Sequence, residues 1–64
     1  MGIMHNLSRL LGKVAVTNTD MSPKGTVIID NEVYEAESQD EYIEAGRGVR
    51  VVKVQGKKIT VKRV

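Results

Sequence analysis

Residues 42–61 read Y-I-E-A-G-R-G-V-R-V-V-K-V-Q-G-K-K-I-T-V. Valine and isoleucine dominate this stretch, which favours β-strands, and the Q-G-K turn in its middle predicts that two strands form a hairpin. Strict alternation fails in the first strand, because Val49 and Val51 share one face while Val52 and Val54 share the other. We therefore expect either a β-bulge near Val51 and Val52 or a strand that is buried on both faces. Closure of a small barrel often requires such a bulge.

The rest of the chain contains further strands. Apolar alternation and turn residues predict strands at residues 13–19, 26–29 and 32–38, and the second strand of the hairpin spans residues 58–63. Asp30 and Asn31 form a two-residue hairpin signal, since Asn tolerates positive φ. Alternation assigns to the core the side chains of Tyr34, Ala36, Ile59 and Val61. Thr60 and Lys62 are expected to face outward. Five short strands separated by turns indicate an all-β domain, either a small barrel or a sandwich.

Length and composition restrict how such a domain becomes stable. A chain of 64 residues forms one domain and buries a small core, and the absence of cysteine excludes disulfides and thiolate metal sites. The core must be aliphatic, because Tyr34 and Tyr42 are the only aromatic residues. A closed sheet is an economical solution, since closure removes exposed strand edges.

Residues 1–11 differ from the strand-rich remainder. A helical stripe is formed by Ile3, Leu7, Leu10 and Leu11, and Gly12 ends it. So short a helix is not stable alone. This segment either packs on the barrel, frays, or is the end of something longer. We expect residues 1–11 to be a linker or extension and residues 12–64 to be the β-domain.

Two connections carry recognisable turn residues. In the turn at residues 20–25, Pro23 fixes φ and Gly25 is expected to adopt a conformation that other residues avoid. Residues 39–46 form the longest connection, and Ile43 is expected to anchor it in the core.

Charge is unevenly distributed although the net charge is only +2. Residues 30–44 contain seven carboxylates and no basic side chain, and residues 45–64 contain seven basic side chains and no acidic one. One interpretation is that acidic and basic strands lie side by side and neutralise each other across the sheet. Alternatively, they form a bipolar surface that binds a partner by electrostatic complementarity. The candidate partner surface comprises Arg50, Lys53, Lys62 and Arg63 on its basic side and Glu35, Glu37, Asp40 and Glu41 on its acidic side.

Residue patterns that support catalysis or cofactor binding are missing. His5 has no carboxylate partner at a useful spacing, and no serine lies in a nucleophile-elbow motif. Gly46-x-Gly48 lacks the third glycine and the helix of a phosphate loop. The carboxylates lack the ligand ladder of a calcium loop, so we expect no catalytic residue, metal, cofactor or small-molecule substrate. No apolar run reaches the roughly 18 residues that span a bilayer.

Single-stranded nucleic acid is the alternative ligand, because small five-stranded barrels often bind it in basic grooves with aromatic platforms. The last two predicted strands are basic, but Tyr34 is assigned to the core and Tyr42 to the start of a loop. Without stacking platforms and with an acidic strand nearby, nucleic-acid binding is the weaker hypothesis.

The order and spacing of these strands resemble a known family. Two segments are similar to the C-terminal soluble domain of the NfeD (nodulation-efficiency) family. One is the stretch quoted above, and the other is G-K-V-A-V-T-N-T-D-M-S-P-K-G-T-V-I-I-D-N-E-V-Y-E-A-E-S over residues 12–38. Asn31 stands where the family usually has glycine, and Ala15 stands near another such position. The resemblance covers residues 12–63 and rests on structural positions of a barrel.

This resemblance implies an OB-fold, a five-stranded Greek-key barrel. It also implies a full-length protein anchored by transmembrane helices, with this domain in the cytoplasm and residues 3–11 as the linker from the membrane. Partners would be membrane proteins of the stomatin, prohibitin and flotillin type. The serine protease domain of long family members matches no positions here. We therefore expect a non-catalytic protein-interaction module, with a nucleic-acid-binding OB-fold as the alternative.

Overall fold

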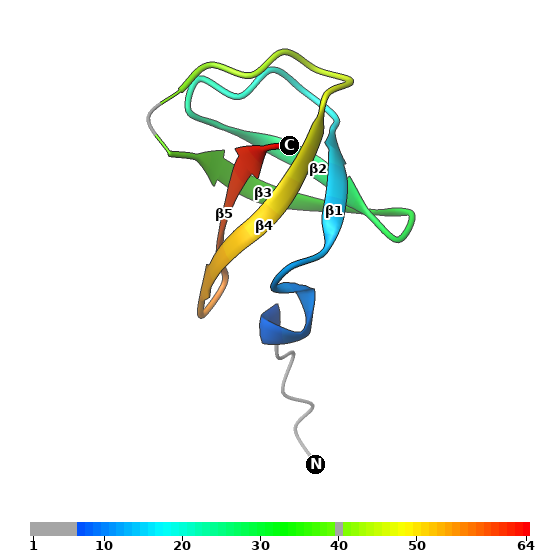
Figure 1. Ribbon diagram of the computed structural model, residues 1–64, viewed down its shortest axis with the longest axis vertical. Helices are drawn as coiled ribbons and strands as arrows, with labels where there is room; N and C mark the ends of the chain where they lie inside the picture. The colour runs from blue at the N-terminus through cyan, green and yellow to red at the C-terminus, as the bar shows by residue number, and fades with distance from the viewer. Residues whose placement is uncertain (1–6, 40) are drawn as a thin grey trace.

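The computed structural model describes residues 7–39 and 41–64, and strands account for most of them. The elements in chain order are the 3-10 helix η1 (Leu7–Leu10) and the strands β1 (Val14–Thr17), β2 (Lys24–Ile29), β3 (Glu32–Ser38), β4 (Gly48–Gln55) and β5 (Lys58–Arg63). Figure 1 shows the strands wrapped around one another, with η1 at one end. The predicted all-β class is confirmed.

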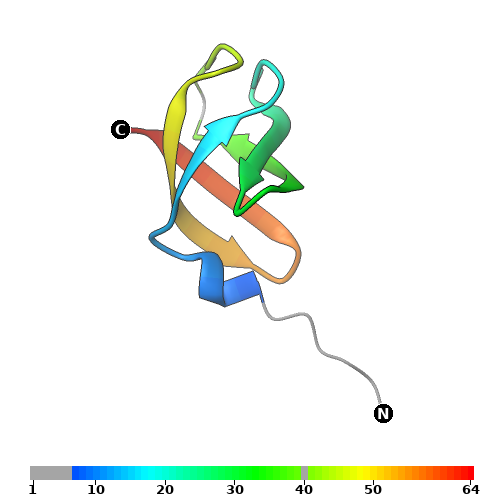
Figure 2. The same cartoon turned by 90° about the vertical axis from the view of Figure 1, so that its right-hand side faces the viewer.

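The strands form a closed barrel in the order β1-β2-β3-β5-β4, with β4 returning to β1. Every pairing is antiparallel except that of β3 with β5. The parallel seam pairs Glu37 with Thr60 and Ser38 with Val61. This Greek-key order is the topology of the OB-fold, which confirms that expectation and excludes the sandwich. Figure 2 shows the barrel from the side.

The irregularity predicted in β4 is a β-bulge. Val51 lies opposite Val61 whereas Lys53 lies opposite Thr60, so Val52 is the extra residue on β4. Val49 and Val51 are fully buried before the bulge, and Val54 points inward after it, opposite Ile59. The bulge therefore keeps apolar side chains on the inner face although the sequence changes its alternation.

The first hairpin also agrees with the sequence. Asp30 and Asn31 both have positive φ, 52° and 69°, as a type I′ turn requires. Lys13 lies 3.0 Å from Asp30, measured from Nζ to Oδ2, and this exposed ion pair joins the hairpin tip to the start of β1.

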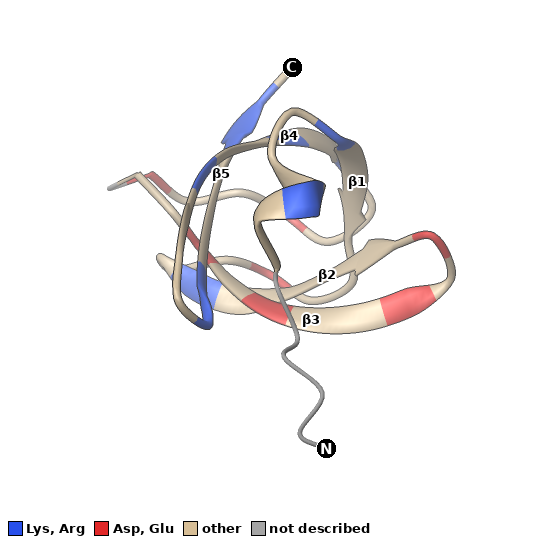
Figure 3. Ribbon diagram, turned by 90° about the horizontal axis from the view of Figure 1, so that it is seen from below, with Lys and Arg blue, Asp and Glu red and all other residues tan. Residues whose placement is uncertain are grey.

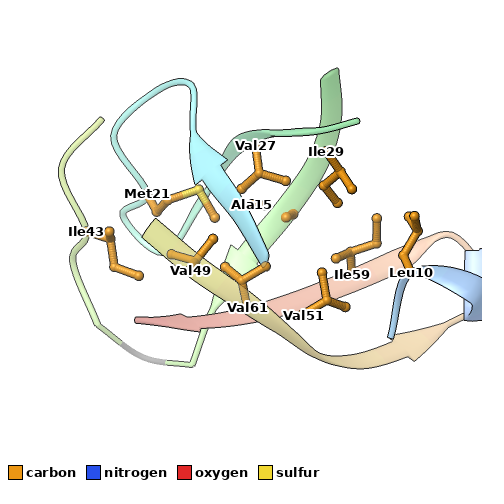
Figure 4. Packing of buried hydrophobic residues seen from close by; sticks show 11 residues of the cluster. Leu10, Ala15, Met21, Val27, Ile29, Ile43, Val49, Val51, Ile59 and Val61 are labelled. Carbon is orange, nitrogen blue, oxygen red and sulfur yellow. The ribbon is translucent and has the colours of Figure 1, made fainter. Parts of the chain in front are cut away.

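Eleven buried apolar side chains fill the barrel, and Figure 4 shows ten of them labelled. Leu10 of η1 is fully buried and lies with Ile29, Val51 and Ile59 at one end of the core. Backbone hydrogen bonds fix this end, because the Gly12 N–H donates to the Val51 carbonyl at 2.8 Å. Within the described residues, the N-terminal segment therefore packs on the barrel.

The helical stripe is only partly correct. Leu7 packs against the core and Leu10 lies in it, but Leu11 is 55% exposed. The reason is the helix type, because a 3-10 helix has three residues per turn and aligns i with i+3 rather than i+4. Ile3 and His5 lie outside the described residues.

Three further assignments differ in part from the structure. Tyr34 packs against the core as expected but is only partly buried, and its hydroxyl donates to Glu32 Oε1 at 2.9 Å. Thr60, expected to face outward, is buried, with Glu37 of β3 and Lys53 of β4 as its neighbours across the two strand pairings. Gly25 does not have positive φ; it lies within β2 against the preceding loop.

Candidate partner-binding surface

Three of the four basic candidates lie together on the outer face of β4 and β5. Arg50 is directly opposite Lys62, and Lys53 is opposite Thr60 in the next row. All three are exposed, and the ion pairs found within residues 7–39 and 41–64 do not involve them. Figure 3 shows the blue basic segments on β5. This basic row is free to meet an external anion.

Arg63 is separated from that row. It lies opposite the buried Val49, so it points toward the end of the barrel instead of outward. There it lines a hollow with Tyr42, Glu44 and Arg47. Glu44 Oε1 accepts a hydrogen bond from Arg47 Nη2 at 3.1 Å, so this hollow contains its own ion pair.

The acidic candidates do not form one patch. Glu35 is exposed on β3, whereas Glu37 is half-buried and lies 3.2 Å from Lys58, measured from Oε2 to Nζ. Glu41 is partly buried, and its carbonyl accepts a hydrogen bond from the Ser38 hydroxyl. Asp40 lies outside the described residues. Neutralisation between acidic and basic strands is thus seen at Glu37 and Lys58. Such surface pairs contribute little to the stability of the fold.

The connection between β3 and β4 is held against β1 by a small polar network. The Thr17 hydroxyl donates to the Glu44 carbonyl at 2.6 Å and accepts from the Arg47 N–H at 2.9 Å. Asp20 Oδ1 accepts from the Ala45 N–H at 2.9 Å. Ile43 is buried, as predicted, and exchanges two backbone hydrogen bonds with Met21. The loop is therefore fixed to the barrel by its backbone.

Tyr42 projects from this loop and is exposed. A hydrogen bond to Asp20 raises the pKa of its phenol, and desolvation and the negative charges of Asp20 and Glu44 add to this effect. The ring is thus an accessible aromatic group with acidic neighbours, which disfavours contact with a phosphate backbone.

A shallow hollow lies where β3 and β5 separate beyond their seam. Lys24, Thr26, Glu35, Glu37, Lys57 and Lys58 contribute its polar lining. It supplies charges but no serine, cysteine or histidine. Among the described residues, no three His, Cys, Asp or Glu side chains lie close enough to hold a metal ion. This arrangement can bind charged groups.

Sequence reasoning did not assemble an apolar patch on the outer face of β1, β2 and β3. Its members are Val14, Val16, Ile28 and Val33. The sequence signal was the run V-A-V-T at residues 14–17, which is apolar on both faces. The strand register was needed to bring Ile28 and Val33 beside it.

No helix within the described parts of the chain is long and apolar enough to cross a membrane. The closed barrel and its strand order define the class of protein, an OB-fold domain with charged and apolar outer faces. The family model for the NfeD-like C-terminal, partner-binding domain matches residues 7–63, so the chain belongs to this family.

Known relatives agree with this assignment. The chain is 40% identical to Membrane protein NfeD1b of Bacillus subtilis (strain 168) in an alignment 65 residues long, which covers 98% of this chain and 15% of that protein. It thus spans a small part of its relative's length.

Two solved structures share the fold. The C-terminal domain of stomatin operon partner protein 1510-C from Pyrococcus horikoshii has a TM-score of 0.83 at 28% identity, covering 88% of this chain and 89% of that one. The soluble domain of a membrane protein implicated in regulation of membrane protease activity, from Corynebacterium glutamicum, has a TM-score of 0.81 at 27% identity, covering 92% and 100%.

Proposed function

We propose that this domain is a non-catalytic interaction module that binds a membrane protein of the stomatin, prohibitin or flotillin type. The match of residues 7–63 to a partner-binding domain carries the proposal. The similar Pyrococcus horikoshii domain, described as that of a stomatin operon partner, supports the choice of partner.

The exposed charges favour binding to a protein surface. Arg50, Lys53 and Lys62 are available for complementary carboxylates, and such pairs raise association rates and select among partners. The hollow between β3 and β5 offers charged groups but no serine, cysteine or histidine, which suits recognition better than turnover.

The membrane setting is also part of the proposal. The Bacillus subtilis relative is named a membrane protein, and the Corynebacterium glutamicum structure is the soluble domain of one. In the full-length protein, helices preceding this domain would anchor it, and the domain would face the cytoplasm. Reporter fusions at the C-terminus of the full-length protein test this, and a reporter active only outside the cytoplasm contradicts it.

An NMR titration tests the partner directly. The ¹⁵N-labelled 64-residue chain is titrated with the soluble domain of the stomatin-type protein from the same genome, and in parallel with a short single-stranded oligonucleotide. Localised amide shifts are expected with the protein and none with the oligonucleotide. Arg50→Glu should weaken binding, whereas Arg9→Glu, a charge reversal at an exposed residue of η1, serves as the control.

Two results oppose the proposal. The first is a lack of shifts with stomatin-type, prohibitin-type and flotillin-type domains alike. The second is a set of shifts with the oligonucleotide alone that disappear on adding salt, which would establish the nucleic-acid alternative.

A further inference from the structure

The apolar patch on β1, β2 and β3 is continuous across the strands. Val16 lies directly opposite Ile28, and Ile28 lies opposite Val33, so the three form one row. Val14 lies two residues before Val16 on the same face of β1. Val14, Val16 and Val33 are 57%, 45% and 61% exposed. Single exposed valines are ordinary, but a contiguous group of this kind marks an interaction surface.

Two free cations continue the row that contains Val14. Arg50 of β4 lies opposite Val14, and Lys62 of β5 lies opposite Arg50. Neither cation forms an ion pair within the described residues, whereas Lys13 at the other side of the patch is already held by Asp30. The patch therefore has a positive margin on its β4 side that is not neutralised.

The middle of this face offers side chains and no free strand edge, because β1 lies between β2 and β4, and β2 lies between β1 and β3. β3 is unpaired on its other side before Glu37, so a partner strand could pair only at that border of the patch. An α-helix satisfies its own backbone groups and can lie across the patch.

The spacing of the row fits a helix that lies across the strands. Neighbouring strands are about 4.8 Å apart, and an α-helix rises about 5.4 Å per turn. Apolar residues at i, i+4 and i+7 of such a helix can therefore meet Val16, Ile28 and Val33 in succession. Because β4 lies on the other side of β1 from β2, the end of the helix that extends past Val16 then approaches Arg50 and Lys62.

We propose that this patch receives an amphipathic α-helix of the partner, with an apolar stripe and with Asp or Glu near the end that approaches Arg50 and Lys62. The inference rests on the proposed partner-binding function and adds the surface and the chemistry of the bound segment. The acidic end follows from charge complementarity, because a basic end would be repelled by the two free cations.

Two synthetic helical peptides test the proposal on the ¹⁵N-labelled 64-residue chain. Both carry the same leucine stripe, and one has glutamate and the other lysine at the polar positions of its two terminal turns. The glutamate peptide should shift amides of β1, β2 and β3, and the lysine peptide should not bind there.

Substitutions identify the contacts. The double variant Val16→Thr/Val33→Thr keeps β-branched residues but loses two apolar methyl groups, so its Kd should rise about tenfold. Arg50→Glu should weaken binding of the glutamate peptide and strengthen binding of the lysine peptide. Val52→Thr on the bulge and Arg9→Glu on η1 are the matched controls and should leave both Kd values unchanged. Circular dichroism verifies that each variant is folded.

If a different ligand occupies the apolar patch, the experiments give different results, and each of these results would overturn the proposal. Tighter binding to vesicles of anionic phospholipid than to the glutamate peptide indicates a membrane surface. Patch shifts that grow with protein concentration alone indicate a second copy of the chain. Shifts confined to the hollow between β3 and β5 place the peptide elsewhere.

A titration with the stomatin-type domain distinguishes a failure of this inference from a failure of the proposed function. If that domain binds through another face, the proposed function holds and the helix site fails. If the glutamate peptide binds at the patch while the stomatin-type domain does not bind, the site holds and the proposed partner fails.

Discussion

A Cβ atom added at Gly25 would lie 2.6 Å from the Asp20 carbonyl oxygen and 2.7 Å from the Met21 sulfur. The loop before β2 passes over the strand at this point, and Met21 behind it is fully buried. Glycine is therefore required because of the close approach of the loop, and the backbone conformation does not demand it.

Gly25→Ala should lower the free energy of unfolding by roughly 1–3 kcal/mol, since the clash involves backbone that cannot rotate away. Urea denaturation measures the loss. Gly48→Ala is the control, because its Cβ would meet only the Val64 side chain at 3.2 Å. Equal losses for the two variants would contradict this explanation.

The raised pKa of Tyr42 predicts how the stability of the domain depends on pH. Its pKa is raised above the usual 10.0, first by the hydrogen bond to Asp20. The folded state therefore holds the phenolic proton more tightly than the unfolded state, so the associated stability is complete below pH 10 and is lost as pH rises through the folded pKa.

Ultraviolet titration of a Tyr34→Phe variant isolates the Tyr42 phenolate. Asp20→Asn in that background should move the pKa of Tyr42 back toward its usual value, because the neighbouring negative charge is removed. An unchanged titration would show that Asp20 does not cause the shift.

At the scale of single elements, η1 closes one end of the barrel. Leu10→Ala removes a fully buried side chain and should cost about 2–4 kcal/mol in urea denaturation. Leu11→Ala, one residue further, changes an exposed side chain and should stay within about 0.5 kcal/mol. Similar effects for the two leucines would mean that η1 does not pack as described.

Local patterns predicted the elements whose causes lie in neighbouring residues. The hairpin at Asp30 and Asn31 and the bulge at Val52 follow from turn chemistry and from a change in alternation. Burial of Thr60 and the requirement for Gly25 were not predictable, because each is caused by a segment that only the folded chain brings near.

The candidate surface shows the same limit. Arg50, Lys53 and Lys62 were recognisable as exposed cations from strand alternation alone. Arg63 was grouped with these three cations, but the structure places it apart from them. It lies on the inward-facing side of β5 beyond the end of the core, so its side chain lines the hollow at the end of the barrel. The apolar patch required the pairing register of three strands, which alternation within each strand cannot supply.

At the scale of the whole molecule, two of the strand pairings in the barrel are short. β3 and β5 are joined through Glu37 with Thr60 and Ser38 with Val61, and β1 and β2 also pair at two positions, whereas β2 and β3 pair along six. Local opening should therefore begin at these two short pairings.

Native-state hydrogen exchange measures that opening. Amides of β5 that face β3 should exchange with a free energy below the global value and with little dependence on urea. Amides of the β2–β3 ladder should exchange only on global unfolding. A single exchange free energy across all strands would show that the barrel opens as one unit.

The return of β4 to β1 has a consequence for how quickly the chain folds. Val14 pairs with Arg50 and Val16 with Gly48, so the barrel closes only when segments from opposite ends of the chain meet. Such pairings give a high contact order, and the entropy of closing the intervening loop must be lost before the contacts form. Despite its small size, this domain should fold in milliseconds to seconds, far more slowly than a helical bundle of equal length.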